Sequence, residues 1–207
     1  MPHGRAMGVQ PTGDRMARKA KINVDTPQRI LDVAERLVQT RGFNGFSYAD
    51  IASTLGITKA SLHYHFPTKA ALGHRLIERY EQRFLDALEA IDRSGVDARE
   101  KLRRYAGIYT DVLRSNRMCL CGMLASDYAT LTKPVKDGVK HFFDRNEEWL
   151  VAVLEAGRRS GTLRFAGSPD VVARGIVGAL EGAMMLARSY GEVVRFEAVA
   201  DRLIAEL

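Results

Sequence analysis

Residues 47–69 contain two short helical patterns separated by a glycine, and this segment constrains the fold most strongly. Ser47, with Asp50 three residues later, approximates a capping box and predicts a helix start. An apolar stripe at helical spacing follows: Ile51, Ala52 and Leu55. Gly56 suits the left-handed backbone that ends a helix, and Thr58 then caps a second helix that Pro67 stops. Two short helices joined by a glycine-containing turn predict a helix-turn-helix.

The second helix is rich in hydrogen-bond donors and lacks carboxylates. Phosphates and base edges accept hydrogen bonds, so such a helix suits the major groove of DNA. We expect Lys59, Tyr64 and Lys69 to contact phosphates. We expect Thr58, Ser61 and His63 to lie nearest base edges or adjoining phosphates, and Ser47 to be a further DNA-binding residue. The alternative is an ordinary helical hairpin with a solvated outer face.

A longer helix is predicted before this pair, with Thr26 as its cap and Pro27 at its first position. Its expected inner face comprises Ile30, Leu31, Ala34, Leu37 and Val38, and Gly42 follows its end. Together with Phe43 and Phe46, these helices predict a three-helix module with its own core.

Several runs here resemble the DNA-binding domain of the TetR family of transcriptional repressors, over about residues 26–75: Arg41-Gly42-Phe43, Ile51-Ala52, Leu55-Gly56-Ile57-Thr58-Lys59, Leu62-His63-Tyr64-His65-Phe66 and Lys69-Ala70-Ala71-Leu72. The family usually has Tyr at the position of His63, whereas this chain has Tyr at 64. The resemblance implies an all-α protein, with a C-terminal helical domain for ligand binding and dimerisation.

Basic charge is concentrated in the same segment. Residues 1–75 hold 11 Lys and Arg against 5 Asp and Glu, whereas residues 76–207 hold 20 of each. Phosphate neutralisation dominates DNA binding, so a basic N-terminal region is the expected footprint. The alternative is a basic tail unrelated to DNA.

We expect three regions: a disordered basic arm over 1–24, the helix-turn-helix domain over 25–75 and the helical domain over 76–207. No apolar run approaches the ~20 residues of a membrane span, and the N-terminus lacks a hydrophobic signal core. Two cysteines do not make a disulfide framework. We therefore expect a cytoplasmic protein that does not associate with a membrane and binds no metal or cofactor.

Helical periodicity continues to the C-terminus without strand-like alternation. The predicted helices cover 69–90, 98–114, 119–131, 134–160, 169–190 and 196–207. No zinc-protease, P-loop or nucleophile-elbow motif occurs in the sequence, so we do not expect an enzyme.

Aromatic and Met residues on these helices fit either a packed core or an apolar ligand cavity. The TetR resemblance implies such a cavity. The candidate ligand-binding residues are Tyr105, Tyr109, Met123, Asp127, Tyr128, His141, Phe142, Glu181 and Met184. We expect a small, mainly apolar effector that releases the repressor from its operator.

Cys119 and Cys121 lie two apart on a predicted helix, so at most one is expected to face the interior. Arg114 and Arg117 lie just upstream and would favour a reactive thiolate. A thiol-based sensor of oxidants or electrophiles on the same scaffold is therefore an alternative function. A helical interaction protein that does not bind DNA is a further alternative.

Segment 169–190 predicts a dimer surface. Gly175, Gly178 and Gly182 allow close approach of another helix, and segment 196–207 adds apolar residues. In the TetR family the last two helices form a four-helix bundle between subunits. We therefore expect a homodimer that binds palindromic double-stranded operator DNA.

Overall fold

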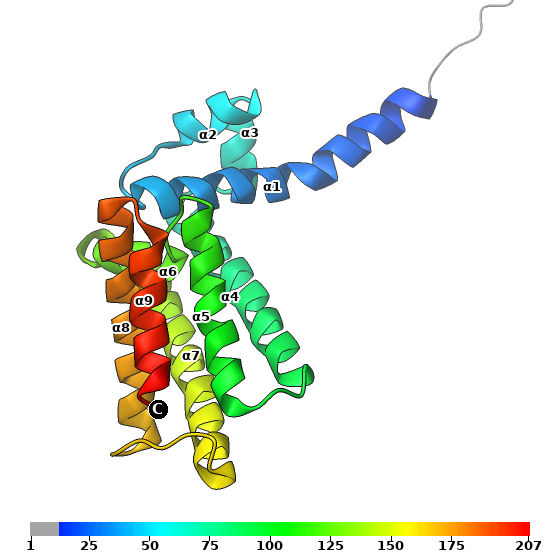
Figure 1. Cartoon of the computed structure of the whole chain (residues 1–207). Helices are drawn as coiled ribbons and strands as arrows, with labels where there is room; N and C mark the ends of the chain where they lie inside the picture. The colour runs from blue at the N-terminus through cyan, green and yellow to red at the C-terminus, as the bar shows by residue number, and fades with distance from the viewer. Residues whose placement is uncertain (1–12) are drawn as a thin grey trace, which may run out of the picture.

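The computed structural model describes the backbone of residues 13–207 and the side chains of residues 25–207. This part of the chain is helical throughout, without a strand, as expected for an all-α protein (Figure 1). The elements are α1 (Gly13–Arg41), α2 (Tyr48–Leu55), α3 (Lys59–His65), α4 (Lys69–Arg93), α5 (Ala98–Arg114), α6 (Leu120–Ser126), the 3-10 turn η1 (Tyr128–Thr130), α7 (Lys133–Ser160), α8 (Pro169–Tyr190) and α9 (Val193–Ala205).

The helix-turn-helix forms at the predicted residues. The Asp50 carboxylate accepts hydrogen bonds from the backbone N–H and the hydroxyl of Ser47, both at 2.7 Å. Gly56 ends α2 with φ of 65°, and the Thr58 hydroxyl accepts the Ser61 N–H at 3.1 Å. The module closes over a buried core that includes Ile30, Val38, Phe46, Ile51 and Leu62.

α1 differs from its predicted start at Thr26. The helix begins at Gly13 and passes through Pro27. Proline lacks one backbone donor and disfavours a helix interior, but a single proline does not always end a helix. The Ala-, Lys- and Arg-rich stretch before it has high helix propensity. The predicted disorder of residues 1–24 therefore conflicts with the helical backbone of 13–24, and residues 1–12 lie outside the described residues.

α4, α5, α7, α8 and α9 form a bundle beneath α1–α3, and α4 runs from α3 into this bundle (Figure 1). α8 packs against both α7 and α9, whereas α4 packs against α7. The last helix begins three residues before its predicted start at Phe196, because Gly191 ends α8 and the chain turns directly into α9. No described helix is long and apolar enough to cross a bilayer.

An ionic cluster around the buried carboxylate of Glu35 joins α1 to α4. The Glu35 carboxylate is buried and accepts hydrogen bonds from Arg79, at 2.8 Å, and from Arg83. Arg79 also donates to Asp32 at 2.7 Å. Loss of both arginines would leave the buried Glu35 charge uncompensated, so this cluster fixes the position of α1 on α4.

Candidate nucleic-acid interface and internal cavity

The second helix of the motif presents its polar side chains to solvent. Thr58, Lys59 and His63 are exposed, and Tyr64 is 81% exposed. Ser61 is half-buried, whereas Ser47, at the start of α2, is exposed. Tyr64 therefore lies on one short helix with exposed hydrogen-bond donors, and this combination suits contact with phosphates.

His63 is held at the end of α3. Its Nδ1 lies 3.2 Å from the Pro67 carbonyl, and its ring centroid lies 4.8 Å from that of Tyr48. Tyr48 in turn donates its hydroxyl to the Phe66 carbonyl at 2.8 Å. These contacts orient His63 on the surface that carries Lys59 and Tyr64.

Lys69 points inward, in contrast to the other predicted DNA contacts. Its ammonium donates to the Phe46 carbonyl and lies 4.1 Å from the Phe46 ring centroid and 4.9 Å from that of Phe43. Burial lowers the pKa of this group, and the charges of Asp127 and Asp50 oppose that effect. Lys69 therefore holds the loop between α1 and α2.

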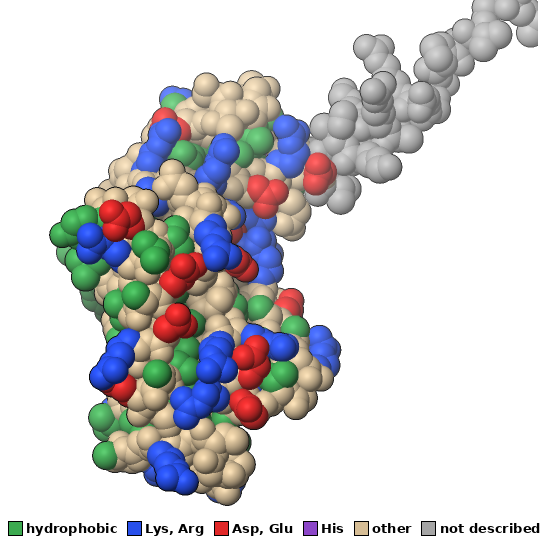
Figure 2. Space-filling model, viewed as in Figure 1, with side chains coloured by type: hydrophobic (Ala, Val, Ile, Leu, Met, Phe, Trp, Pro, Cys, Tyr) green, Lys and Arg blue, Asp and Glu red, His purple; other side chains and the backbone are tan. Residues whose placement is uncertain are grey.

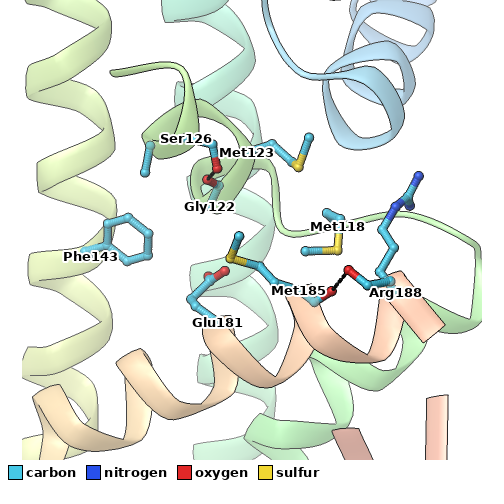
Figure 3. A pocket seen from close by; sticks show the side chains of 10 residues that line it. Met118, Gly122, Met123, Ser126, Phe143, Glu181, Met185 and Arg188 are labelled. Carbon is cyan, nitrogen blue, oxygen red and sulfur yellow. Dashed lines mark hydrogen bonds between the residues drawn. The ribbon is translucent and has the colours of Figure 1, made fainter. Parts of the chain in front are cut away.

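A cavity of about 650 Å³ lies between α6, α7 and α8 (Figure 3). It is lined by Met118, Gly122, Met123, Ala125, Ser126, Phe143, Glu181, Met185, Arg188 and Ser189. Met123 and Glu181 are the two predicted ligand-binding residues in this lining. Phe143 and Met185 are further Met and aromatic residues of the same helices. Sequence reasoning missed Met118, Arg188 and Ser189, because no periodic signal marks the rim of a cavity.

Four predicted ligand-binding residues belong to the packed core instead: Tyr105, Tyr109, Phe142 and Met184. The hydroxyls of Tyr105 and Tyr109 lie 3.1 Å apart, and Tyr105 donates to Asn146 Oδ1 at 3.0 Å. These buried hydroxyls therefore satisfy one another and do not face the cavity.

The remaining three predicted ligand-binding residues lie elsewhere. Asp127 accepts hydrogen bonds from the backbone N–H groups of Phe43, at 2.6 Å, and Asn44, at 3.2 Å. It therefore holds the loop that follows α1. Tyr128 is exposed, with the Lys136 ammonium 4.8 Å from its ring centroid. His141 Nδ1 lies 2.8 Å from Glu81 Oε1 in a separate groove.

Glu181 is the carboxylate of the cavity. Its Oε1 atom is buried and has no hydrogen-bond partner. Its Oε2 atom occupies the space beside Gly122, where an added Cβ would lie 2.3 Å from it. Burial raises the pKa of Glu181 to about 7, against the opposing effect of a hydrogen bond with the Cys119 thiol. The space beside Gly122 is therefore filled by Glu181.

Both cysteines are buried, which corrects the prediction that at most one faces the interior. Cys119 is not within a helix but caps α6, with its Sγ 3.4 Å from the Gly122 N–H, so helical spacing does not apply to the pair. Burial raises the pKa of both thiols well above its ordinary value, and the charge of Glu181 raises it further. Arg114 instead pairs with Glu197 at 2.8 Å.

The cavity lining also contacts the end of α1. The last carbonyls of a helix lack partners within it. Here the Met118 N–H donates to the Gln39 carbonyl at 3.1 Å. Arg188 donates to the carbonyls of Thr40, at 3.2 Å, and Asn116, at 3.0 Å. Two residues that line the cavity thus hold the helix that leads into the helix-turn-helix.

Comparisons with known proteins agree with this architecture. Residues 30–76 match the model of bacterial regulatory proteins of the tetR family, and residues 98–203 match the tetracyclin repressor-like C-terminal domain. The chain belongs to the TetR family. It is a DNA-binding transcriptional regulator, as the TetR resemblance of the sequence implied.

Two solved TetR-family structures and one repressor are similar to this chain. A TetR-family regulator from Agrobacterium tumefaciens is 32% identical, with a TM-score of 0.87 over 89% of this chain and 98% of that one. A Legionella pneumophila TetR regulator is 36% identical, with a TM-score of 0.79 over 86% and 95%. The Escherichia coli HTH-type transcriptional repressor NemR is 25% identical over 154 residues, 70% of this chain and 75% of NemR.

This TetR-family chain carries an apolar, glycine-lined surface on α8 and α9. The exposed large hydrophobic residues there are Val171, Met185, Leu186, Tyr190, Val194 and Val199. Gly175, Gly178 and Gly182 have open space where a Cβ would lie. In Figure 2, hydrophobic side chains gather along the left edge of the molecule, over α8. We refer to this surface as the α8–α9 face. Regulators of this family bind operator DNA and function as dimers.

Proposed function

We propose that this regulator is a repressor, released from its operator when a small, mainly apolar ligand occupies the cavity between α6, α7 and α8. The observation that carries the proposal is that this cavity shares Met118 and Arg188 with the contacts at the end of α1. Its volume lies within the range of small-molecule sites.

The proposed release follows from linkage between two conformations. A ligand that displaces Arg188 or Met118 weakens the contacts with the Gln39 and Thr40 carbonyls. The protein then shifts towards a conformation in which α1 and the helix-turn-helix sit differently on the bundle. The shift cannot exceed the difference in ligand affinity between the two conformations.

We further propose a homodimer through the α8–α9 face and a palindromic operator. Two recognition helices would then enter successive major grooves about 34–36 Å apart. The proposed DNA contacts come from Ser47, Thr58, Lys59, Ser61, His63 and Tyr64 at the exposed surface of the motif. Lys69 supports this surface from inside, through the Phe46 carbonyl. No catalytic activity is proposed.

The thiol mechanism receives less support from the geometry. A thiol reacts as the thiolate, and burial beside Glu181 disfavours that form at both cysteines. Reversible occupancy of the cavity needs no such activation. We therefore propose the cavity, and not a modified cysteine, as the origin of the response.

The test starts from a duplex selected from a random-sequence pool by the purified protein. Fluorescence anisotropy of the protein–duplex complex is then followed during titration with a small-molecule library, with and without reductant. Wild type is compared with the Cys119→Ser/Cys121→Ser double variant. We expect reversible release that persists in the double variant. Release by electrophiles alone, abolished in the double variant, would replace the cavity mechanism with the thiol mechanism.

A further inference from the structure

We infer that the ligand is an apolar molecule that carries a protonated amine, and that its N–H group donates to the Glu181 carboxylate. This inference rests on the proposed function, because it names the chemical class of the molecule that fills the cavity.

The first argument is the unpartnered oxygen. Glu181 Oε1 is buried and makes no hydrogen bond. A buried carboxylate oxygen without a partner is costly even where the group has one thiol contact, and a charge-assisted N–H donor offsets this cost most strongly. In Figure 3, Glu181 extends from α8 towards Gly122 of α6, with Phe143 on one side and Met185 on the other. Glu181 belongs to the cavity lining, so a ligand amine in the cavity lies beside its carboxylate.

The second argument is the charge balance of the cavity. Among the described residues that line it, Glu181 is the sole anion and Arg188 the sole cation. Arg188 already donates to the Thr40 and Asn116 carbonyls, through Nη2 and Nη1 respectively. No cation of the lining is therefore available to Glu181, and an incoming cation would supply the missing charge.

The third argument is the remaining lining. Met118, Met123, Met185 and Phe143 present polarisable sulfur atoms and one aromatic face. Thioethers adapt to irregular apolar shapes, and an aromatic face attracts a cation. The lining therefore suits a hydrocarbon or ring system attached to the amine. A neutral carbonyl ligand, bound to protonated Glu181, is the competing outcome of the test.

Isothermal titration calorimetry at pH 8 with two matched probe pairs tests the inference. The pairs are 2-naphthylmethylamine with 2-naphthylmethanol, and octylamine with octan-1-ol. The members of a pair share their apolar part and differ in the ammonium group. We expect each amine to bind wild type at least tenfold more tightly than its alcohol.

Glu181→Gln keeps the side-chain volume and removes the charge. The amine and its alcohol should therefore bind this variant with about equal affinity. Glu155→Gln is the matched control, because Glu155 pairs with Arg159 on the exposed side of α7. Equal binding of amine and alcohol by wild type, or an unchanged preference in Glu181→Gln, would overturn the inference.

The outcomes separate this inference from the proposed function. Alcohol binding that equals amine binding, together with release of the selected duplex, would leave the cavity mechanism intact and reject the amine. Failure of both members of both pairs to bind would reject the amine class, and the library titration of the duplex complex would then decide the cavity mechanism independently. The comparison within wild type does not depend on the folding of any variant.

Discussion

Glu181 brings an ionisable group into the interior of the bundle, and this predicts a pH-dependent stability. Burial raises its pKa from 4.5 to about 7 in the folded chain. A raised carboxyl pKa means that the folded state binds the proton more tightly than the unfolded state. Its stabilising contribution is therefore complete below pH 4.5 and is lost as the pH rises to about 7. The total loss is about 3 kcal/mol.

Urea unfolding of wild type and Glu181→Gln between pH 4.5 and 8 measures this contribution. We expect the free energy of unfolding of wild type to fall relative to that of Glu181→Gln across this window. The nearby thiol of Cys119 and the hydroxyls of Tyr80, Tyr105 and Tyr109 have raised pKa values and stay neutral over the same range. Parallel pH profiles for the two proteins would show that Glu181 is not responsible.

Lys59 and Lys69 provide a second prediction, because one ammonium faces solvent and the other faces the protein. Lys59→Ala should weaken binding to all duplexes and lower the slope of log affinity against log salt by about one unit, without changing the melting temperature. Lys69→Ala should instead lower the free energy of unfolding by about 1–2 kcal/mol, because it removes a hydrogen bond and two cation–π contacts. Anisotropy at several salt concentrations measures the loss of DNA affinity, and thermal unfolding measures the loss of stability. A stability loss in Lys59→Ala and a salt-slope change in Lys69→Ala would exchange the two roles.

Residue composition predicted the apolar character of the cavity better than it predicted which residues line the cavity. Met and aromatic residues do surround it, but Tyr105 and Tyr109 bond to each other in the core, whereas Glu181 reaches the cavity. The choice depends on which flank of α8 faces α6, and this is set by the packing of α7 and α9 around α8. One sequence carries no signal for that rotation.

Helix ends were predictable where a glycine or a capping residue marks them. Gly161 and Gly191 adopt positive φ and end α7 and α8 at the predicted residues. The first residues of α1 and α6 could not be predicted in this way. The proline inside α1 is also a normal first-turn residue, and the cap of α6 is a cysteine, which is not among the preferred capping residues.

The α8–α9 face gives a prediction at the level of one helix. Gly178 and Gly182 have no atom within 4 Å of an added Cβ in the single chain, so Gly178→Leu and Gly182→Leu should not disturb the subunit itself. Replacing glycine in a helix even adds about 0.8 kcal/mol of propensity. Between two close helices, however, the new side chains should overlap and dissociate the proposed dimer.

Light scattering and circular dichroism test this separation of folding from assembly. We expect a wild-type dimer at micromolar concentration, and variants that stay helical but become monomeric and lose affinity for the selected duplex. Gly107→Leu is the matched control, because it is also a helical glycine with open space but lies on α5. A wild-type monomer, or a dimer that tolerates both leucines, would contradict the proposed face.

At the scale of the whole molecule, the contacts between the two domains differ in character, and two of them bear on the position of α1. The Glu35–Arg79–Arg83 cluster fixes α1 to α4 through charge. The end of α1 is held instead by hydrogen bonds to its Gln39 and Thr40 carbonyls, from groups that line the cavity. Backbone carbonyl contacts are individually modest, so the second contact is the easier one to release.

Arg188→Gln tests whether this contact connects cavity and DNA. The shorter amide cannot span the Thr40 and Asn116 carbonyls, so one or both contacts are lost. Hydrogen exchange at residues 40–42, at the end of α1, should become about tenfold faster, which corresponds to roughly 1.4 kcal/mol of lost local stability. For any library compound that releases the duplex from wild type, the ratio of duplex affinities without and with that compound should fall towards one. Arg174→Gln is the control, since Arg174 also lies on α8 but pairs with Glu147 at the surface. Wild-type exchange rates and an unchanged affinity ratio in Arg188→Gln would mean that the signal leaves the cavity by another route.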